Sequence, residues 1–94
     1  MEKYGYVRVS SKEQNPARQI QAMEEAGIKS GNMFVDKISG KTFQRPAYYE
    51  LLGKLKEGDV LIIKSIDRLG RNYQEILEQW RKIVKEIKAN INEN

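Results

Sequence analysis

The chain has 94 residues, 39% of them hydrophobic and 32% charged, a composition that is typical of one soluble globular domain. It contains no cysteine and no histidine, which excludes disulfides and removes the most common general base and metal ligand. Its net charge of +4 fits ordinary solubility as well as a nucleic-acid partner. The longest apolar run, residues 60–63, is too short to span a membrane, and no secretory signal follows Met1, so we expect a cytoplasmic protein without a membrane partner.

The first part of the chain predicts a strand, a helix and a second strand. Residues 3–9 alternate and are rich in β-formers, which is typical of a strand. Asn15 and Pro16 provide a cap and a first residue for a helix that is predicted to end at Gly27. Its buried face is expected to consist of Ile20, Met23 and Ala26. Residues 33–36 predict a short second strand.

The second part predicts a loop, two helices and a third strand. Residues 37–45 have no hydrophobic period and contain Gly, Ser and Thr, so they predict a mobile loop. Pro46 begins a second predicted helix, which ends near Lys56 and is expected to bury Tyr49, Leu52 and Leu55. Residues 60–66 predict a third strand that is buried on both faces. A last helix is predicted from an apolar stripe that comprises Ile76, Leu77, Trp80, Ile83, Val84, Ile87 and Ile91.

Alternating strands and helices predict an α/β fold with a parallel sheet and helices on both faces. Of the two simple strand orders, 2-1-3 has a topological switch point between the first and third strands, where ligands bind outside the carboxyl ends. Polar residues follow both of these strands. They are Arg8, Ser10 and Ser11 after the first, and Lys64, Asp67, Arg68 and Arg71 after the third. We therefore expect two clusters that are distant in sequence to converge at one edge of the sheet.

The residue types of these clusters suit a phosphate group. Guanidinium groups pair with phosphate oxygens and stay protonated, and Arg68 and Arg71 would share one face of a helical turn. A charged helix start capped by Asp67 explains the same residues, so a structural role stays open. Because no histidine can serve Ser10 as a base, the sequence argues against a Ser-His-Asp hydrolase and favours a phosphoryl-transfer serine assisted by arginines.

Three segments resemble the signature segments of the resolvase/invertase family of serine site-specific recombinases. They are residues 4–11 (YGYVRVSS), 34–40 (FVDKISG) and 66–72 (IDRLGRN), in the expected order and at the expected separations. The resemblance runs from about Tyr4 to the end of the last helix, and it implies a resolvase-like catalytic domain of a mobile genetic element.

The resemblance implies that Ser10 attacks a DNA phosphodiester to form a 5′-phosphoserine intermediate, with release of a 3′-hydroxyl and without cofactor, ATP or metal. It also implies that Asp67 assists proton transfer or positions an arginine. The implied phosphate-binding residues are Arg8, Arg45, Arg68 and Arg71, and the implied supporting residues are Tyr6, Gln14, Gln19 and Lys64. DNA is the implied partner, and the implied assembly of the full-length protein is a homodimer or tetramer.

Members of this family usually continue past residue 94 with another strand, a long helix and a separate DNA-binding domain. We therefore expect residues 1–94 to form an incomplete catalytic domain that lacks the DNA-binding domain and is inactive alone. Two alternatives stay open. One is a non-enzymatic basic α/β module that binds nucleic acid or regulates a partner, and the other is an enzyme that acts on small phosphorylated molecules.

Overall fold

The computed structural model describes residues 1–10, 16–38 and 44–93. Its strands are β1 (Lys3–Ser10), β2 (Met33–Ile38), β3 (Val60–Ile63) and β4 (Asn90–Glu93). Its α-helices are α1 (Ala17–Glu25), α2 (Pro46–Lys54) and α3 (Tyr73–Arg81), which continues as the π-helical segment η3 (Lys82–Ile87). Two short 3-10 helices, η1 (Ser30–Asn32) and η2 (Ile66–Leu69), lie in the connections.

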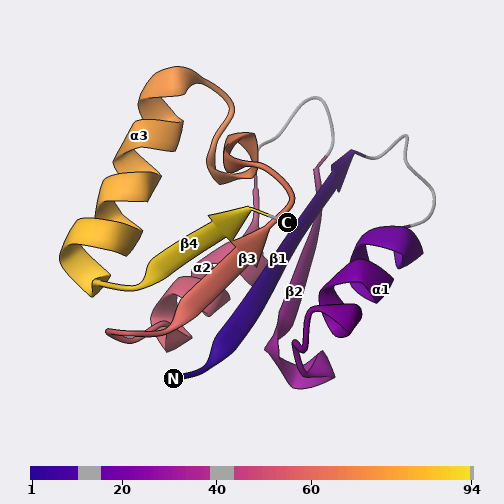
Figure 1. The fold of residues 1–94 in the computed structure, drawn as a ribbon. Helices are drawn as coiled ribbons and strands as arrows, with labels where there is room; N and C mark the ends of the chain where they lie inside the picture. The colour runs from indigo at the N-terminus through magenta and orange to yellow at the C-terminus, as the bar shows by residue number, and fades with distance from the viewer. Residues whose placement is uncertain (11–15, 39–43, 94) are drawn as a thin grey trace.

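The strands form a parallel sheet in the order β2-β1-β3-β4 (Figure 1). The predicted order 2-1-3 is confirmed, because β1 lies between β2 and β3. The additional strand, which we expected only beyond residue 94, is already present as β4. Ile91 pairs there with Leu61, so the prediction that Ile91 belongs to the last helix is wrong. Lys88 ends that helix by adopting a left-handed conformation with φ of 65°, and the chain then turns into β4.

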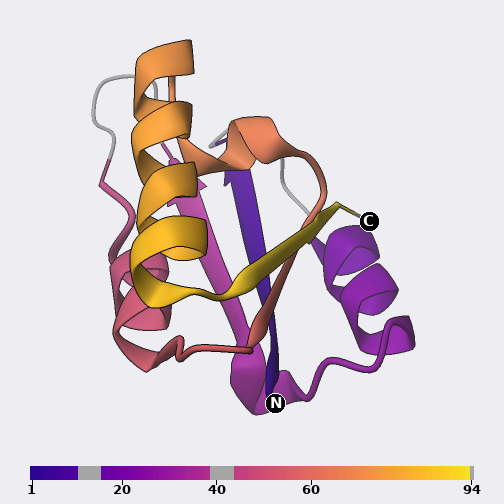
Figure 2. The same ribbon diagram turned by 60° about the vertical axis from the view of Figure 1, so that its left-hand side comes forward.

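Helices cover both faces of the sheet, as predicted: α1 lies on one face, and α2 and α3 lie on the other (Figure 2). Alternating side chains of β1 contribute to the hydrophobic clusters on the two faces of the sheet. Val7 and Val9 belong to the hydrophobic cluster under α1, whereas Tyr4 and Tyr6 belong to the cluster under α2 and α3. Since side chains alternate along a strand, Arg8 projects on the same face as Tyr6. The third strand is buried at every position, which confirms its central place.

The predicted element boundaries needed several corrections. The third strand ends at Ile63 because Ile66 already begins η2, and the second strand extends to Ile38. The second helix ends at Lys54 and buries Tyr48, Leu51 and Leu52, while Tyr49 is 57% exposed. The ring of Tyr48 packs against that of Tyr6 with 5.1 Å between centroids, which fixes this phase of the helix.

The predicted mobile loop and the predicted start of the first helix can be compared with the structure only in part. Residues 39–43 of the predicted mobile loop and Asn15, the predicted helix cap, lie outside the described residues. The first helix begins at Ala17 and is followed by Gly27 with φ of 91°, as its predicted end requires. Within it, Met23 is fully buried, whereas the expected core residues Ile20 and Ala26 are half-buried.

Candidate active site

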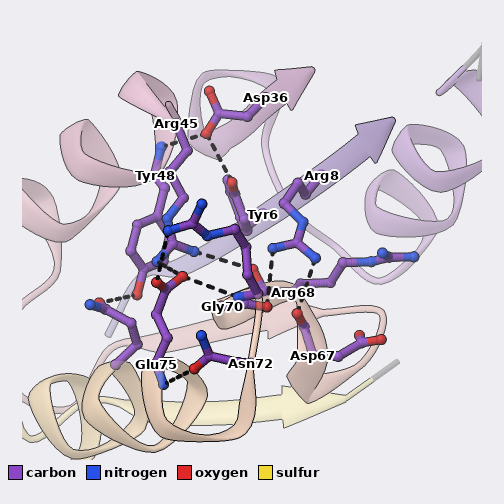
Figure 3. A network of polar contacts seen from close by, with 12 residues as sticks. Tyr6, Arg8, Asp36, Arg45, Tyr48, Asp67, Arg68, Gly70, Asn72 and Glu75 are labelled. Atoms are coloured by element: carbon purple, nitrogen blue, oxygen red, sulfur yellow. Dashed lines mark hydrogen bonds and ion pairs between the residues drawn. The ribbon is translucent and has the colours of Figure 1, made fainter. Parts of the chain in front are cut away.

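Three segments meet beyond the carboxyl end of β1: the end of that strand, the start of α2, and the turn from η2 to α3 (Figure 3). Arg8 joins the first to the third, because its Nη1 donates to the carbonyl of Gly70 at 3.4 Å and its Nη2 to the carbonyl of Asp67 at 3.2 Å. The predicted convergence of the two clusters is thereby confirmed for Arg8 and residues 67–70. Ser10 ends β1 and pairs through its backbone with Ile38 of β2, at the same edge of the sheet.

Arg45 joins the start of α2 to the same turn. Its Nη1 donates to the carbonyl of Arg68 at 3.4 Å, and its Nη2 lies 3.7 Å from Oε1 of Glu75. Its guanidinium carbon also lies 4.0 Å from the centroid of the Tyr48 ring, a cation–π contact. The Arg45 side chain is only 1% exposed, and these contacts compensate for the burial of its charge.

Asp36 holds the start of α2 in place. This residue of β2 is 4% exposed, and its carboxylate accepts hydrogen bonds from the backbone nitrogens of Ala47 and Tyr48, each at 3.0 Å, and from the Tyr6 hydroxyl at 2.9 Å. A carboxylate at a helix N-terminus is favoured by the exposed N–H groups and the helix dipole. Burial first, and then the charge of Asp36, raise the pKa of Tyr6, which therefore stays a hydrogen-bond donor.

The turn from η2 to α3 differs from the predicted helical start. Gly70 is extended and separates Arg68 from Arg71, so these arginines do not share one face of a helical turn. The cap of α3 is Asn72 rather than Asp67: its Oδ1 accepts a hydrogen bond from the backbone nitrogen of Glu75 at 2.8 Å. Nε of Arg68 is buried and has no hydrogen-bond partner among the residues that the structure describes.

The electrostatics of the site combine clustered positive charge with a few carboxylates. Burial first, and then the nearby charges of Arg68 and Arg45, lower the pKa of the Arg8 guanidinium, which nevertheless stays charged. A hydrogen bond from the Ser65 hydroxyl is the main cause that lowers the pKa of Asp67, and Arg68 and Arg8 lower it further. Positive groups held this close are typical of a site for an anion.

The other predicted site residues are placed differently. Tyr6 is fully buried, and its hydroxyl donates to Asp36 beneath the site. Gln19 and Lys64 lie together at a pocket of about 240 Å³ beside α1, which Arg18, Ala22 and Met23 also line. Ser11 and Gln14 lie outside the described residues.

Three residues that organise the site are not among those predicted from the sequence: Asp36, Asn72 and Glu75. The spacing of Asn72 and Glu75 is that of a helix-capping box, a signal that would have moved the helix start to residue 73. Asp36 lies among apolar residues of a strand, where a carboxylate needs buried donors. In the part of the chain that is described, no group of three or more Asp or Glu side chains is arranged as a metal site, and none of the helices has the length and apolar character needed to cross a membrane.

Comparison with known proteins agrees with this architecture. Residues 3–91 match the family described as the resolvase N-terminal domain. The transposon Tn3 resolvase of Escherichia coli is 38% identical over 86 residues, which are 92% of this chain and 44% of that protein. The R46 site-specific recombinase of E. coli is 40% identical over 83% of this chain and 41% of its own length. The DNA-invertase of Escherichia phage P1 is 45% identical over 78% of this chain and 38% of its own length.

The chain thus spans less than half the length of each of these relatives. The family match nevertheless covers nearly all of its residues, including the three signature segments named from the sequence. The chain belongs to the resolvase N-terminal domain family of the serine recombinases.

Proposed function

We propose that this domain is the catalytic part of a site-specific DNA recombinase in which Ser10 attacks a DNA phosphodiester. The Ser10 hydroxyl gives its proton to solvent, its oxygen bonds to phosphorus, and the bond from phosphorus to the 3′-oxygen breaks. The 3′-oxygen takes up a proton, and the 5′-phosphoserine link conserves the bond for rejoining. The observation that carries this proposal is the contact of Arg8 with the carbonyls of Asp67 and Gly70, which gathers arginines beyond the end of β1.

We assign charge stabilisation at phosphorus to Arg8, Arg68 and Arg71. The Arg71 side chain is 62% exposed and therefore open to a DNA backbone. The buried Nε of Arg68 has no acceptor among the described residues, so a phosphate oxygen would complete its hydrogen bonding. Preorganised donors of this kind stabilise the charge that develops on the phosphoryl oxygens in the transition state.

We assign Asp67 a positioning role rather than that of an acid. The hydrogen bond from Ser65 and the charges of Arg68 and Arg8 lower its pKa, so the carboxylate is ionised at neutral pH. The backbone carbonyl of Asp67 positions Arg8 by accepting a hydrogen bond from its Nη2, and the carboxylate adds a negative charge nearby. The ionised carboxylate can accept a proton, but it has none to donate to the leaving 3′-oxygen.

The remaining candidates support these groups. Tyr6 acts through Asp36, which fixes the start of α2 and with it Arg45, the fourth proposed phosphate-binding arginine. Gln19 and Lys64, which line the pocket beside α1, and Gln14 are proposed to support the site.

DNA is the partner that we infer, and the names of the matched resolvases and of the DNA-invertase support it. We further propose that residues 1–94 act as a catalytic domain, that the protein works in the cytoplasm, and that it assembles as a homodimer or tetramer on DNA.

A covalent trapping experiment tests this function. Residues 1–94 are joined to the part of Tn3 resolvase that lies beyond the matched region, and the fusion is incubated with a nicked DNA substrate carrying the Tn3 resolvase site. We expect a protein–DNA adduct that mass spectrometry maps to Ser10. Ser10→Ala should abolish the adduct and leave DNA binding nearly intact, because one hydroxyl contributes little to affinity beside the arginines.

Ser11→Ala is the matched control and should still form the adduct. An adduct on Ser11 or Tyr6 would show that the nucleophile is misassigned. Salt-sensitive DNA binding with no adduct at all would favour the alternative of a non-enzymatic nucleic-acid-binding module.

A further inference from the structure

Glu75 forms ion pairs with two of the arginines at the site, Arg45 and Arg71. Its Oε1 is 3.7 Å from Nη2 of Arg45, and its Oε2 is 3.8 Å from Nη2 of Arg71. Oε1 also accepts a hydrogen bond from the backbone nitrogen of Arg71 at 3.1 Å. The two carboxylate oxygens therefore face donors from α2 and from the start of α3, in the way that two oxygens of a phosphate face paired guanidinium groups.

The local structure places the carboxylate there. Glu75 occupies the first turn of α3, where Asn72 accepts a hydrogen bond from its backbone nitrogen. Gly70 provides the room, since a Cβ at that position would lie 2.8 Å from Cβ and from Cγ of Glu75. The backbone of Gly70 is extended, so the glycine is required by this close approach and not by its conformation.

In this arrangement, Arg45 cannot contact a phosphodiester directly. Its side chain is 1% exposed, and a phosphodiester cannot reach a guanidinium group that is covered. Glu75 is the contact best suited to move, because its side chain is 24% exposed. The two ion pairs are also longer than the roughly 2.7–2.9 Å of a charge-assisted hydrogen bond, so they hold the carboxylate weakly.

We propose that the space between Arg45 and Arg71 is an anion-binding site, which the Glu75 carboxylate occupies in the free domain and which a phosphodiester group enters by displacing it. This inference rests on the proposed function and adds to it a residue that competes with the substrate. On displacement, Nη2 of Arg45, Nη2 of Arg71 and the Arg71 backbone nitrogen become donors to phosphate oxygens. The Glu75 side chain turns outward into solvent from the exposed side of α3.

Binding of inorganic phosphate to the 94-residue chain tests the inference. The probe is titrated while NMR follows the side-chain Nε–H signals of Arg45 and Arg71. The apparent affinity of a site is reduced by the fraction of time in which it is open, so removing a competitor that fills it about nine-tenths of the time raises the affinity about tenfold. We expect Glu75→Gln to bind phosphate about tenfold more tightly than the unmodified chain, with shifts at both arginines.

Glu78→Gln is the matched control, because Glu78 is exposed on the same helix and its substitution removes the same charge. It should leave the affinity within about twofold, since an exposed charge at a distance is screened. Glu75→Ala, which also removes the carboxylate, should reproduce the gain. The thermal unfolding of all three variants, measured in parallel, identifies any loss of folding.

Equal or weaker binding by Glu75→Gln, an equal gain for Glu78→Gln, or a lack of phosphate-dependent shifts at Arg45 and Arg71 would each overturn the inference. The outcome is separable from that of the trapping experiment. Tighter phosphate binding by Glu75→Gln without any Ser10 adduct would keep the anion site and reject the recombinase mechanism.

Discussion

The two ends of the parallel sheet hold their buried charges in opposite ways. At the amino end, the Asp59 carboxylate is 6% exposed and accepts hydrogen bonds from the backbone nitrogens of Glu2 at 3.0 Å and Lys56 at 2.9 Å. These two hydrogen bonds, together with nearby positive charges, lower the pKa of Asp59. The charge at this end is matched by fixed donors, so it stabilises the fold and leaves nothing for a ligand to satisfy.

At the carboxyl end, like charges are gathered instead. Arg45 and Arg68 both lower the pKa of Arg8, and the buried Nε of Arg68 has no partner in the described part of the chain. Donors that are held in place but incompletely paired favour an incoming anion. Substitutions at the carboxyl end should therefore change activity more than stability, and substitutions at the amino end should do the reverse.

The largest expected effect is that of Arg68→Ala on catalysis. The substitution removes the guanidinium but keeps the backbone carbonyl that accepts from Arg45, so the fold should be preserved. Losing one preorganised donor at a reacting centre lowers the rate by about 100- to 1000-fold. The adduct-forming rate of the fusion with the Tn3 resolvase part, measured in single turnover, checks this value. Arg81→Ala, an exposed arginine at the end of α3, is the control and should react at the normal rate.

The expected difference between the two ends would be contradicted if Arg68→Ala lowered the free energy of unfolding by as much as it raised the free energy of activation. Such a result would mean that the arginines at the carboxyl end maintain the fold. Normal adduct formation by the variant would remove Arg68 from the proposed site.

The convergence at this end could be predicted from sequence because the signals are local. Alternation in residues 3–9 and an apolar run at 60–63 define parallel strands, and their order places Arg8 near residues 67–71. The contacts of Asp36 and Glu75 could not be predicted in the same way. They join segments that are distant in sequence, and only the packing of α2 and α3 on the sheet brings them together.

The end of the last helix shows a different limit. Ile87 and Ile91 are four residues apart, a spacing that continues the helical stripe, yet Ile91 lies in β4. A periodic pattern cannot show that Lys88 takes a left-handed conformation, since lysine rarely does so. Tyr48 and Tyr49 posed a similar problem, because adjacent tyrosines do not reveal which of them faces the core.

The second expected effect concerns Asp59→Asn and stability. The two carboxylate oxygens of Asp59 each accept a hydrogen bond from a backbone N–H group. In asparagine, an NH2 group replaces one of these oxygens, so one backbone N–H loses its acceptor, and an unsatisfied buried donor costs about 1–3 kcal/mol. Urea unfolding at pH 7 measures the loss. Glu57→Gln, which removes the same charge from an exposed neighbour, should leave the free energy of unfolding unchanged within about 0.5 kcal/mol.

The pH dependence sharpens this test. The folded pKa of Asp59 lies below its ordinary value of 3.8, so its stabilisation is fully present above pH 3.8 and is lost as the pH falls through the folded pKa. The difference between the original chain and Asp59→Asn should therefore shrink on acidification below pH 3.8. A constant difference down to pH 2 would show that the charge of Asp59 is not what stabilises this end.

The smallest expected effect is a gain in stability at Lys88, the only non-glycine residue with a positive φ among residues 1–10, 16–38 and 44–93. Lys88 has φ of 65° and accepts a hydrogen bond from the backbone nitrogen of Gly58 at 3.0 Å, so its conformation sets the start of β4. The left-handed region costs a non-glycine residue about 1–2 kcal/mol, and glycine gives back part of the gain through the greater freedom of the unfolded chain. Lys88→Gly should thus raise the free energy of unfolding by up to about 1 kcal/mol. Lys85→Gly, within η3, should lower it by a similar amount because glycine disfavours helical backbone.

Strained backbone often serves a functional site, but Lys88 lies at the end of the sheet opposite to the arginines. Phosphate affinity should therefore be equal in Lys88→Gly and the original chain, and a change of more than about twofold in that affinity would show that the two ends are coupled.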